Sequence, residues 1–87
     1  MKEVEFIEFL NSCINALKSA KGINLEIRKP NKTSENNCQV LFKNLDTGKY
    51  FEINFYWPAV EKINTEEEKI QNGKLVVKKL YQNVRLG

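Results

Sequence analysis

Residues 38–57 constrain the fold more than any other stretch, because polar and apolar side chains alternate on both sides of a turn. The turn signal is Asp46-Thr47-Gly48-Lys49, with a glycine where short hairpin turns favour one. Alternation with a period of two gives each strand two distinct faces. The core face takes Cys38, Val40 and Phe42 from the first strand and Phe51, Ile53, Phe55 and Trp57 from the second.

The turn and the two core faces together predict a register for this hairpin. Phe42 is expected opposite Ile53 on the core face. On the other face Lys43 is expected opposite Glu52, and opposite charges across two strands stabilise a sheet. That outer face then carries an excess of large side chains, with Leu45 opposite Tyr50. Its members are Gln39, Leu41, Lys43, Leu45, Tyr50, Glu52, Asn54 and Tyr56.

Two helices are expected at the ends of the chain. Apolar residues recur at helical spacing over residues 3–20, and Gly22 stands where a left-handed residue would end the helix. The second helix begins at a capping box, Thr65 with Glu68, and continues to about Asn83. The Asn72-Gly73 pair is also a turn signal, so a short helix over 65–71 followed by a fourth strand over 74–81 is the alternative.

The remaining segments complete one α+β domain over residues 1–87. Residues 23–29 alternate as a strand that Pro30 ends, residues 31–37 are expected to form a mobile loop, and residues 59–64 a connector. The predicted architecture is a two-layer αβββα domain, in which a three-stranded antiparallel meander has both helices on one face.

Composition is that of a folded soluble protein, with 41% hydrophobic and 29% charged residues. The chain has no apolar run long enough to span a membrane and no secretory signal pattern, so a cytoplasmic location is expected. Cys13 and Cys38 fall on the apolar side of their elements, and both are expected to be buried free thiols.

The sequence lacks the residues that most catalytic sites need. It contains no histidine, its one aspartate, Asp46, belongs to a turn, and its glycines are dispersed. Two cysteines without histidine cannot complete a zinc site, and the acids at 66–68 fit the start of a helix. We therefore expect no catalytic, cofactor or metal site and no small-molecule substrate.

Nucleic-acid binding is the alternative function. In topology, the predicted order αβββα resembles the double-stranded RNA-binding domain, which aims a lysine-rich start of its second helix at phosphates. Here the matching helix start is acidic, Thr65-Glu66-Glu67-Glu68, so the resemblance covers the order of elements and transfers no residues. A separate basic cluster, for which a solvated helix face is the simpler interpretation, consists of Lys74, Lys78, Lys79 and Arg85.

The favoured hypothesis is a small non-enzymatic module that binds another protein, or a second copy of itself, through the outer sheet face. Exposed apolar and aromatic patches of this kind tend to mark interfaces. The competing interpretation is that the second helix, the connector over 58–64 or the tail of the chain covers this face. The abundance of Lys, Asn and Ile fits an adaptor or inhibitor encoded by a phage or another mobile element. The predicted partner-binding residues are Leu41, Lys43, Leu45, Tyr50, Glu52 and Tyr56.

Overall fold

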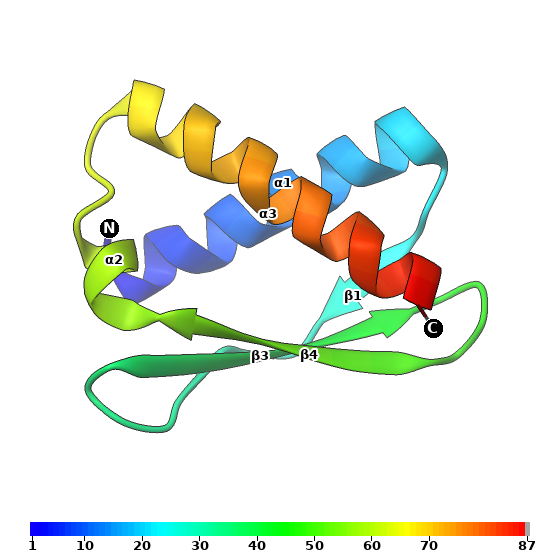
Figure 1. Ribbon diagram of the computed structural model, residues 1–87, viewed down its shortest axis with the longest axis horizontal. Helices are drawn as coiled ribbons and strands as arrows, with labels where there is room; N and C mark the ends of the chain where they lie inside the picture. The colour runs from blue at the N-terminus through cyan, green and yellow to red at the C-terminus, as the bar shows by residue number, and fades with distance from the viewer. Residues whose placement is uncertain (87) are drawn as a thin grey trace.

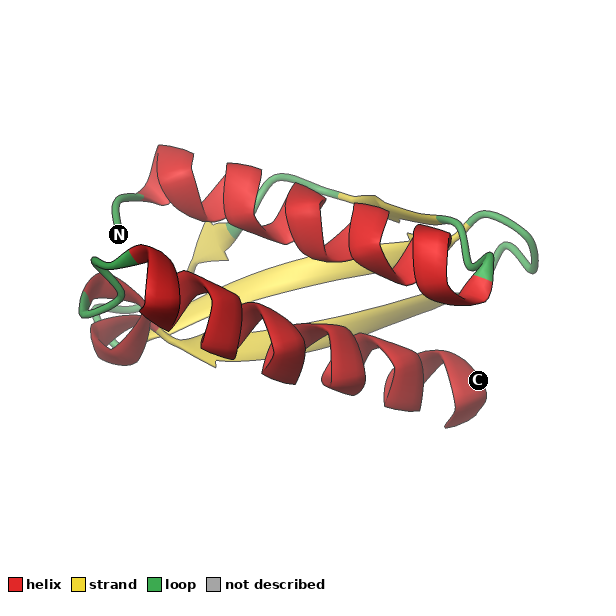
Figure 2. Ribbon diagram, turned by 90° about the horizontal axis from the view of Figure 1, so that it is seen from above, coloured by secondary structure: helices red, strands yellow, loops and turns green. Residues whose placement is uncertain are grey.

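The computed structural model describes residues 1–86 as a sheet with helices on one of its faces (Figure 1). The elements are α1 (Glu3–Lys21), β1 (Leu25–Ile27), β2 (Asn31–Lys32), β3 (Asn37–Asn44), β4 (Tyr50–Tyr56), α2 (Trp57–Glu61) and α3 (Glu66–Leu86). Seen from above, α1 and α3 lie side by side over the same face of the sheet (Figure 2). This arrangement confirms the predicted two-layer α+β fold.

All strand pairs are antiparallel, and β3 is the central strand. It pairs with β4 on one side and with both β1 and β2 on the other. The expected mobile loop over 31–37 is wrong at its start, because Lys32 pairs with Cys38 and the Thr33 amide donates to the Asn37 carbonyl at 3.0 Å. The backbone after Pro30 therefore pairs with β3 again, and a short turn connects β2 to β3.

The predicted hairpin register is wrong by two residues. Phe42 lies opposite Phe51, and Lys43 lies opposite Tyr50. The cause is Asn44, whose side-chain oxygen accepts a 3.0 Å hydrogen bond from the Asp46 amide while its backbone N–H donates to Lys49 at 2.8 Å. The loop is thus Leu45 to Gly48, and Gly48 has the positive φ of 74° that glycine tolerates. A two-residue shift keeps the side chains within β3 and β4 on their predicted faces.

The core lies between the sheet and the two long helices, α1 and α3. The apolar stripe of α1 is buried as predicted, and the helix ends at Gly22 with a φ of 67°. Cys13 and Cys38 are both buried free thiols, which confirms that prediction. The fully buried large side chains are Phe6, Leu10, Leu17, Cys38, Val40, Phe42 and Leu80.

Helix α2 replaces the expected end of the hairpin and part of the expected connector. Trp57 is its first residue rather than the last strand residue, and the Trp57 amide donates to the Asn36 carbonyl at 2.9 Å. The Trp57 ring is buried edge-on against Phe6, with centroids 5.5 Å apart. Pro58 fits the first turn of this helix because a first-turn amide needs no partner. Val60 and Ile63 pack into the core.

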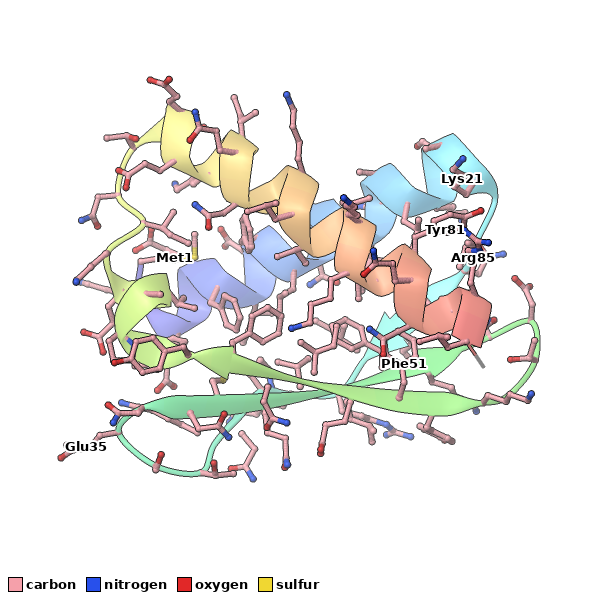
Figure 3. All side chains as sticks on the ribbon, in the orientation of Figure 1. Met1, Lys21, Glu35, Phe51, Tyr81 and Arg85 are labelled. Carbon is pink, nitrogen blue, oxygen red and sulfur yellow. The ribbon has the colours of Figure 1, made fainter. Side chains whose placement is uncertain are left out.

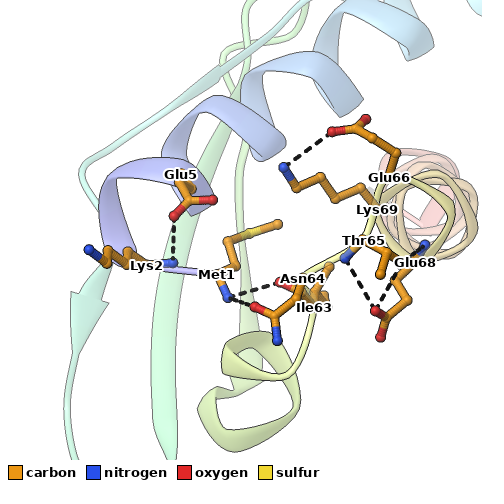
Figure 4. A network of polar contacts seen from close by, with 9 residues as sticks. All are labelled: Met1, Lys2, Glu5, Ile63, Asn64, Thr65, Glu66, Glu68 and Lys69. Carbon is orange, nitrogen blue, oxygen red and sulfur yellow. Dashed lines mark hydrogen bonds and ion pairs between the residues drawn. The ribbon is translucent and has the colours of Figure 1, made fainter.

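Helix α3 is continuous, so the alternative with a fourth strand over 74–81 is wrong. Its start is the predicted capping box: the Glu68 amide donates to Thr65 Oγ1 at 3.1 Å, and the Thr65 amide donates to Glu68 Oε1 at 3.2 Å (Figure 4). Beside it, the Met1 nitrogen donates to the Ile63 carbonyl at 2.9 Å, which joins the start of α1 to the segment before α3.

Candidate functional site

The outer face of the sheet is open. Helices α1, α2 and α3 leave this face uncovered, so for residues 1–86 the interpretation that a helix or the connector covers it is wrong (Figure 1). Three of the predicted site residues expose much of their surface here: Leu41 37%, Tyr50 50% and Tyr56 64%. The face is therefore available to a partner.

The observed register changes which side chains meet on this face. Lys43 lies between Glu26 of β1 and Tyr50 of β4, and Leu41 lies opposite Glu52. The predicted cross-strand pair of Lys43 with Glu52 is therefore absent. Since the single apolar residue Leu41 has a charged neighbour across the ladder, the face is a mixed surface and not the continuous apolar patch that the sequence suggested.

Leu45 does not belong to the outer face. It lies in the loop after β3, and its amide donates to the Asn24 carbonyl at 2.9 Å, which draws it toward the β1 edge. There it borders a surface depression together with Leu25 and Pro30. The predicted pair of Leu45 with Tyr50 is wrong, because the loop takes Leu45 out of the ladder.

One end of the outer face is a cationic and aromatic cluster around Tyr50. The ammonium of Lys43 lies 5.5 Å from the centroid of the Tyr50 ring. A side-chain hydrogen bond from Arg28, followed by the positive charge of Lys43, lowers the pKa of the Tyr50 hydroxyl below its usual value of 10.0. Sequence reasoning missed Arg28, although its outward position in the 23–29 alternation placed it on this face.

The other end of the face is neutral and rich in amides. Asn37 donates from Nδ2 to Thr33 Oγ1 at 2.8 Å and to Asn54 Oδ1 at 3.1 Å. Tyr56 lies opposite Asn37 and is largely exposed. The face thus offers ionic and aromatic contacts at one end, amide hydrogen bonds and a tyrosine at the other, and Leu41 between them.

The basic cluster of α3 is only partly one surface. Lys74, Lys78 and Arg85 follow helical spacing along one side, whereas Lys79 is rotated by about 100° from Lys78. The structure adds Lys21, at the end of α1. Its ammonium lies 5.1 Å from the centroid of the Tyr81 ring, and the Arg85 guanidinium lies 5.7 Å from the same ring (Figure 3).

A groove between α1 and α3, on the side away from the sheet, is a feature that sequence reasoning missed. Its floor is mainly apolar, and small side chains at four-residue spacing on α1 open it: Ser12, Ala16 and Ala20. The charged residues Glu5, Glu8, Glu66, Lys69 and Lys74 line its margins. That spacing of small residues was the sequence signal that could have revealed it.

Within residues 1–86, no group of histidine, cysteine, aspartate or glutamate side chains is placed to hold a metal ion. Over the same residues, no helix has both the length and the apolar character needed to cross a bilayer. Comparisons with protein-family models, with curated proteins and with solved structures found no match for the chain.

Proposed function

We propose that this chain is a non-enzymatic protein-binding module that uses the outer face of its sheet. The observation that carries the proposal is an uncovered face on which Leu41, Tyr50 and Tyr56 are exposed beside Arg28. Protein interfaces are enriched in tyrosine and arginine and hold apolar anchors within a polar rim. A partner with a complementary acidic and aromatic surface fits the Tyr50 end of the face.

The module would act as an adaptor or an inhibitor of a larger protein in the cytoplasm. Its two thiols are buried and unpaired, which is usual for proteins in reducing compartments. The Lys, Asn and Ile bias of the chain supports an origin in a phage or another mobile element. Affinity capture from the native host, followed by binding with the purified partner, tests this role.

The decisive variant carries Leu41→Asp and Arg28→Glu, because Leu41 lies on the central strand β3, Arg28 belongs to the Tyr50 cluster, and both side chains are exposed. We expect it to remain folded and to lose partner binding at least tenfold, since truncating an interface anchor typically costs about 2 kcal/mol or more and about 1.4 kcal/mol is a tenfold change. The control is Val4→Asp, a 70% exposed residue of α1. Equal binding by both variants would reject the proposal.

Nucleic-acid binding is the second candidate, and the positions of Lys21 and Arg85 against the Tyr81 ring favour it. Together with Lys74 and Lys78 they place positive charge along the exposed side of the helical layer. Affinity for single- and double-stranded polymers should then fall steeply with salt. Lys78→Glu should weaken binding, whereas Lys29→Glu, an identical charge change next to β1, should weaken it less. No binding at low salt ends this candidate.

A further inference from the structure

The sheet has one long free edge, formed by β4. The backbone hydrogen bonds from Asn44 to Lys49 and from Trp57 to Asn36 fix the phase of the β3–β4 ladder, so the odd-numbered residues of β4 bond to β3. The N–H and C=O groups of the even-numbered residues point the other way. These residues are Tyr50, Glu52, Asn54 and Tyr56. Within residues 1–86 β4 pairs only with β3, so this outward row is available.

The two edges of the sheet differ in the features that discourage edge-to-edge pairing. The edge formed by β1 and β2 consists of two short segments separated by Arg28-Lys29-Pro30, and charges with a proline block strand addition. β4 is seven residues long, has no bulge in its register with β3, and contains no proline or lysine. Its only charge is Glu52. An edge of this kind is suited to pairing.

The sequence of β4 is complementary to itself. Residues 50–56 read Tyr-Phe-Glu-Ile-Asn-Phe-Tyr, which is the same from both ends except that Glu52 exchanges with Asn54. Antiparallel pairing of two copies about Ile53 brings Tyr50 to Tyr56, Phe51 to Phe55 and Glu52 to Asn54 of the second copy. Each contact then occurs twice, as a two-fold symmetric interface requires.

The direction of the backbone groups selects the same register. Outward groups must meet outward groups, so even-numbered residues have to pair with even-numbered residues, and the arrangement about Ile53 satisfies this. Moving the axis to Glu52 would keep the hydrogen bonds but place two carboxylates directly opposite each other, which is unfavourable. The axis at Ile53 places an amide opposite each carboxylate and pairs the whole strand.

Helix α3 supplies further apolar surface on the same side of the molecule. It is the helix that lies over the β4 side of the sheet, whereas α1 lies over the β1 side (Figure 2). Val76 and Leu80 of α3 turn inward, and Gly73 and Val77 border the groove with α1. Leu75 and Leu86, about three turns apart, therefore lie on the side away from α1, where they are 66% and 88% exposed.

We propose that the protein forms a two-fold symmetric homodimer by antiparallel pairing of β4 with β4 of a second copy, centred on Ile53. The inner-face residues Phe51 and Phe55, which are only partly buried in the single chain, gain each other as neighbours across the joint. Leu75 and Leu86 face the α3 helix of the second copy. The result is one continuous sheet with both outer faces on the same side.

Amide hydrogen exchange, measured by NMR at low and high protein concentration, tests the pairing residue by residue. The amides of Ile53 and Phe55 bond to β3 and should be protected at every concentration. The amides of Glu52 and Asn54 should exchange freely in the monomer and become protected only in the dimer. Sedimentation must show a dimer under the conditions in which they are protected.

Two variants of Asn54 with opposite charges form a matched pair, because both lose the same side-chain contact with Asn37. Asn54→Lys places an ammonium opposite Glu52 of the second copy and should tighten the dimer by about tenfold, since the pair occurs twice. Asn54→Glu places a carboxylate there and should weaken the dimer by about tenfold. If any charge at this edge simply hindered pairing, both variants would weaken the dimer.

Asn54→Pro removes the outward donor and the side-chain contact with Asn37 but leaves the backbone bonds to β3 intact, so a folded monomer is expected. A chain that stays monomeric up to millimolar concentration overturns the proposal. A dimer in which the Glu52 and Asn54 amides still exchange freely also overturns it, because the contact is then elsewhere. If the proline variant does not fold, the two charge variants and the exchange pattern decide. These tests of the dimer are independent of the proposed partner site: if Leu41→Asp loses partner binding, the exchange pattern and the dimer should be unchanged.

Discussion

Gly73 of α3 lies directly against Phe9 of α1: a Cβ added to Gly73 would be 3.7 Å from Cε1 of the Phe9 ring. It would also lie 4.0 Å from Sγ of Cys13, whose thiol contacts the Gly73 carbonyl at 3.9 Å. These are ordinary van der Waals separations. The helices therefore approach closely at this glycine, but a methyl group still fits between them.

Gly73→Ala should stabilise the protein. Glycine inside a helix costs about 0.8–1.0 kcal/mol relative to alanine, and the added methyl gains contacts with Phe9 without displacing it. The free energy of unfolding from urea denaturation should rise by about 1 kcal/mol. Gly22→Ala is the control, because Gly22 has a φ of 67° and that substitution should destabilise by about 1–2 kcal/mol. A loss of stability in Gly73→Ala would mean that α1 and α3 cannot accommodate the methyl group.

The Glu68 carboxylate should contribute to the free energy of unfolding in a pH-dependent way. The hydrogen bond from the Thr65 hydroxyl, 2.9 Å long, and then that from the Thr65 amide lower the pKa of the Glu68 carboxyl below its usual 4.5. Because the folded pKa is lowered, this contribution is complete above the unfolded pKa and is lost as the pH falls through the folded pKa. Glu68→Gln retains an acceptor without the ionisation.

Urea midpoints measured from neutral pH to acid check this difference. The stability of the native chain should fall more between neutral pH and pH values below the usual 4.5 than that of Glu68→Gln. Thr65→Ala should bring the two closer together, because it removes the hydroxyl that causes most of the shift. Parallel pH curves for the native chain and Glu68→Gln would show that the capping box does not hold the carboxylate in solution.

The arrangement of elements could be predicted from the sequence, because the signals for it are local. Gly22, Thr65 and Glu68 marked helix ends, and the two-residue alternation around Ile53 assigned each strand face. The predicted faces of these strands were correct despite the register error, because a shift of two residues preserves the side on which each residue lies. The predicted neighbours across the ladder were wrong, and Lys43 lies opposite Tyr50 rather than Glu52.

What could not be predicted depends on contacts between distant segments. The side chain of Asn44 bends the loop and sets the register, yet an asparagine at a strand end has several common roles. Trp57 continues the alternation of β4, but its amide bonds to Asn36 and the chain turns there into α2. Arg28 joins the candidate site only because the β1 edge brings it near Tyr50.

The Tyr50 hydroxyl should ionise at a lower pH than an ordinary tyrosine, because a hydrogen bond from Arg28 and the nearby charge of Lys43 stabilise the phenolate. NMR titration of the ring carbon that bears the hydroxyl measures this pKa directly. Arg28→Ala should raise the pKa toward 10.0, because it removes the hydrogen bond that is the largest single cause, and Lys43→Met should also raise it. An unchanged pKa in Arg28→Ala would separate Arg28 from the Tyr50 cluster and weaken the case for this end of the face.

Cys13 should resist thiol reagents in the folded protein. Burial against Gly73 and the α1–α3 contact raises the pKa of its thiol from 9.0 to about 11, so the reactive thiolate is scarce at pH 8. Burial likewise raises the pKa of Cys38, which lies on the helix-covered face of β3. A disulfide reagent at pH 8 should therefore react slowly with native protein and rapidly with both thiols in denaturant. When the reagent is added at increasing urea concentrations, both thiols should become reactive at the concentration at which the whole protein unfolds. Early reaction of Cys13 alone would instead show that α3 separates from α1 before the sheet unfolds.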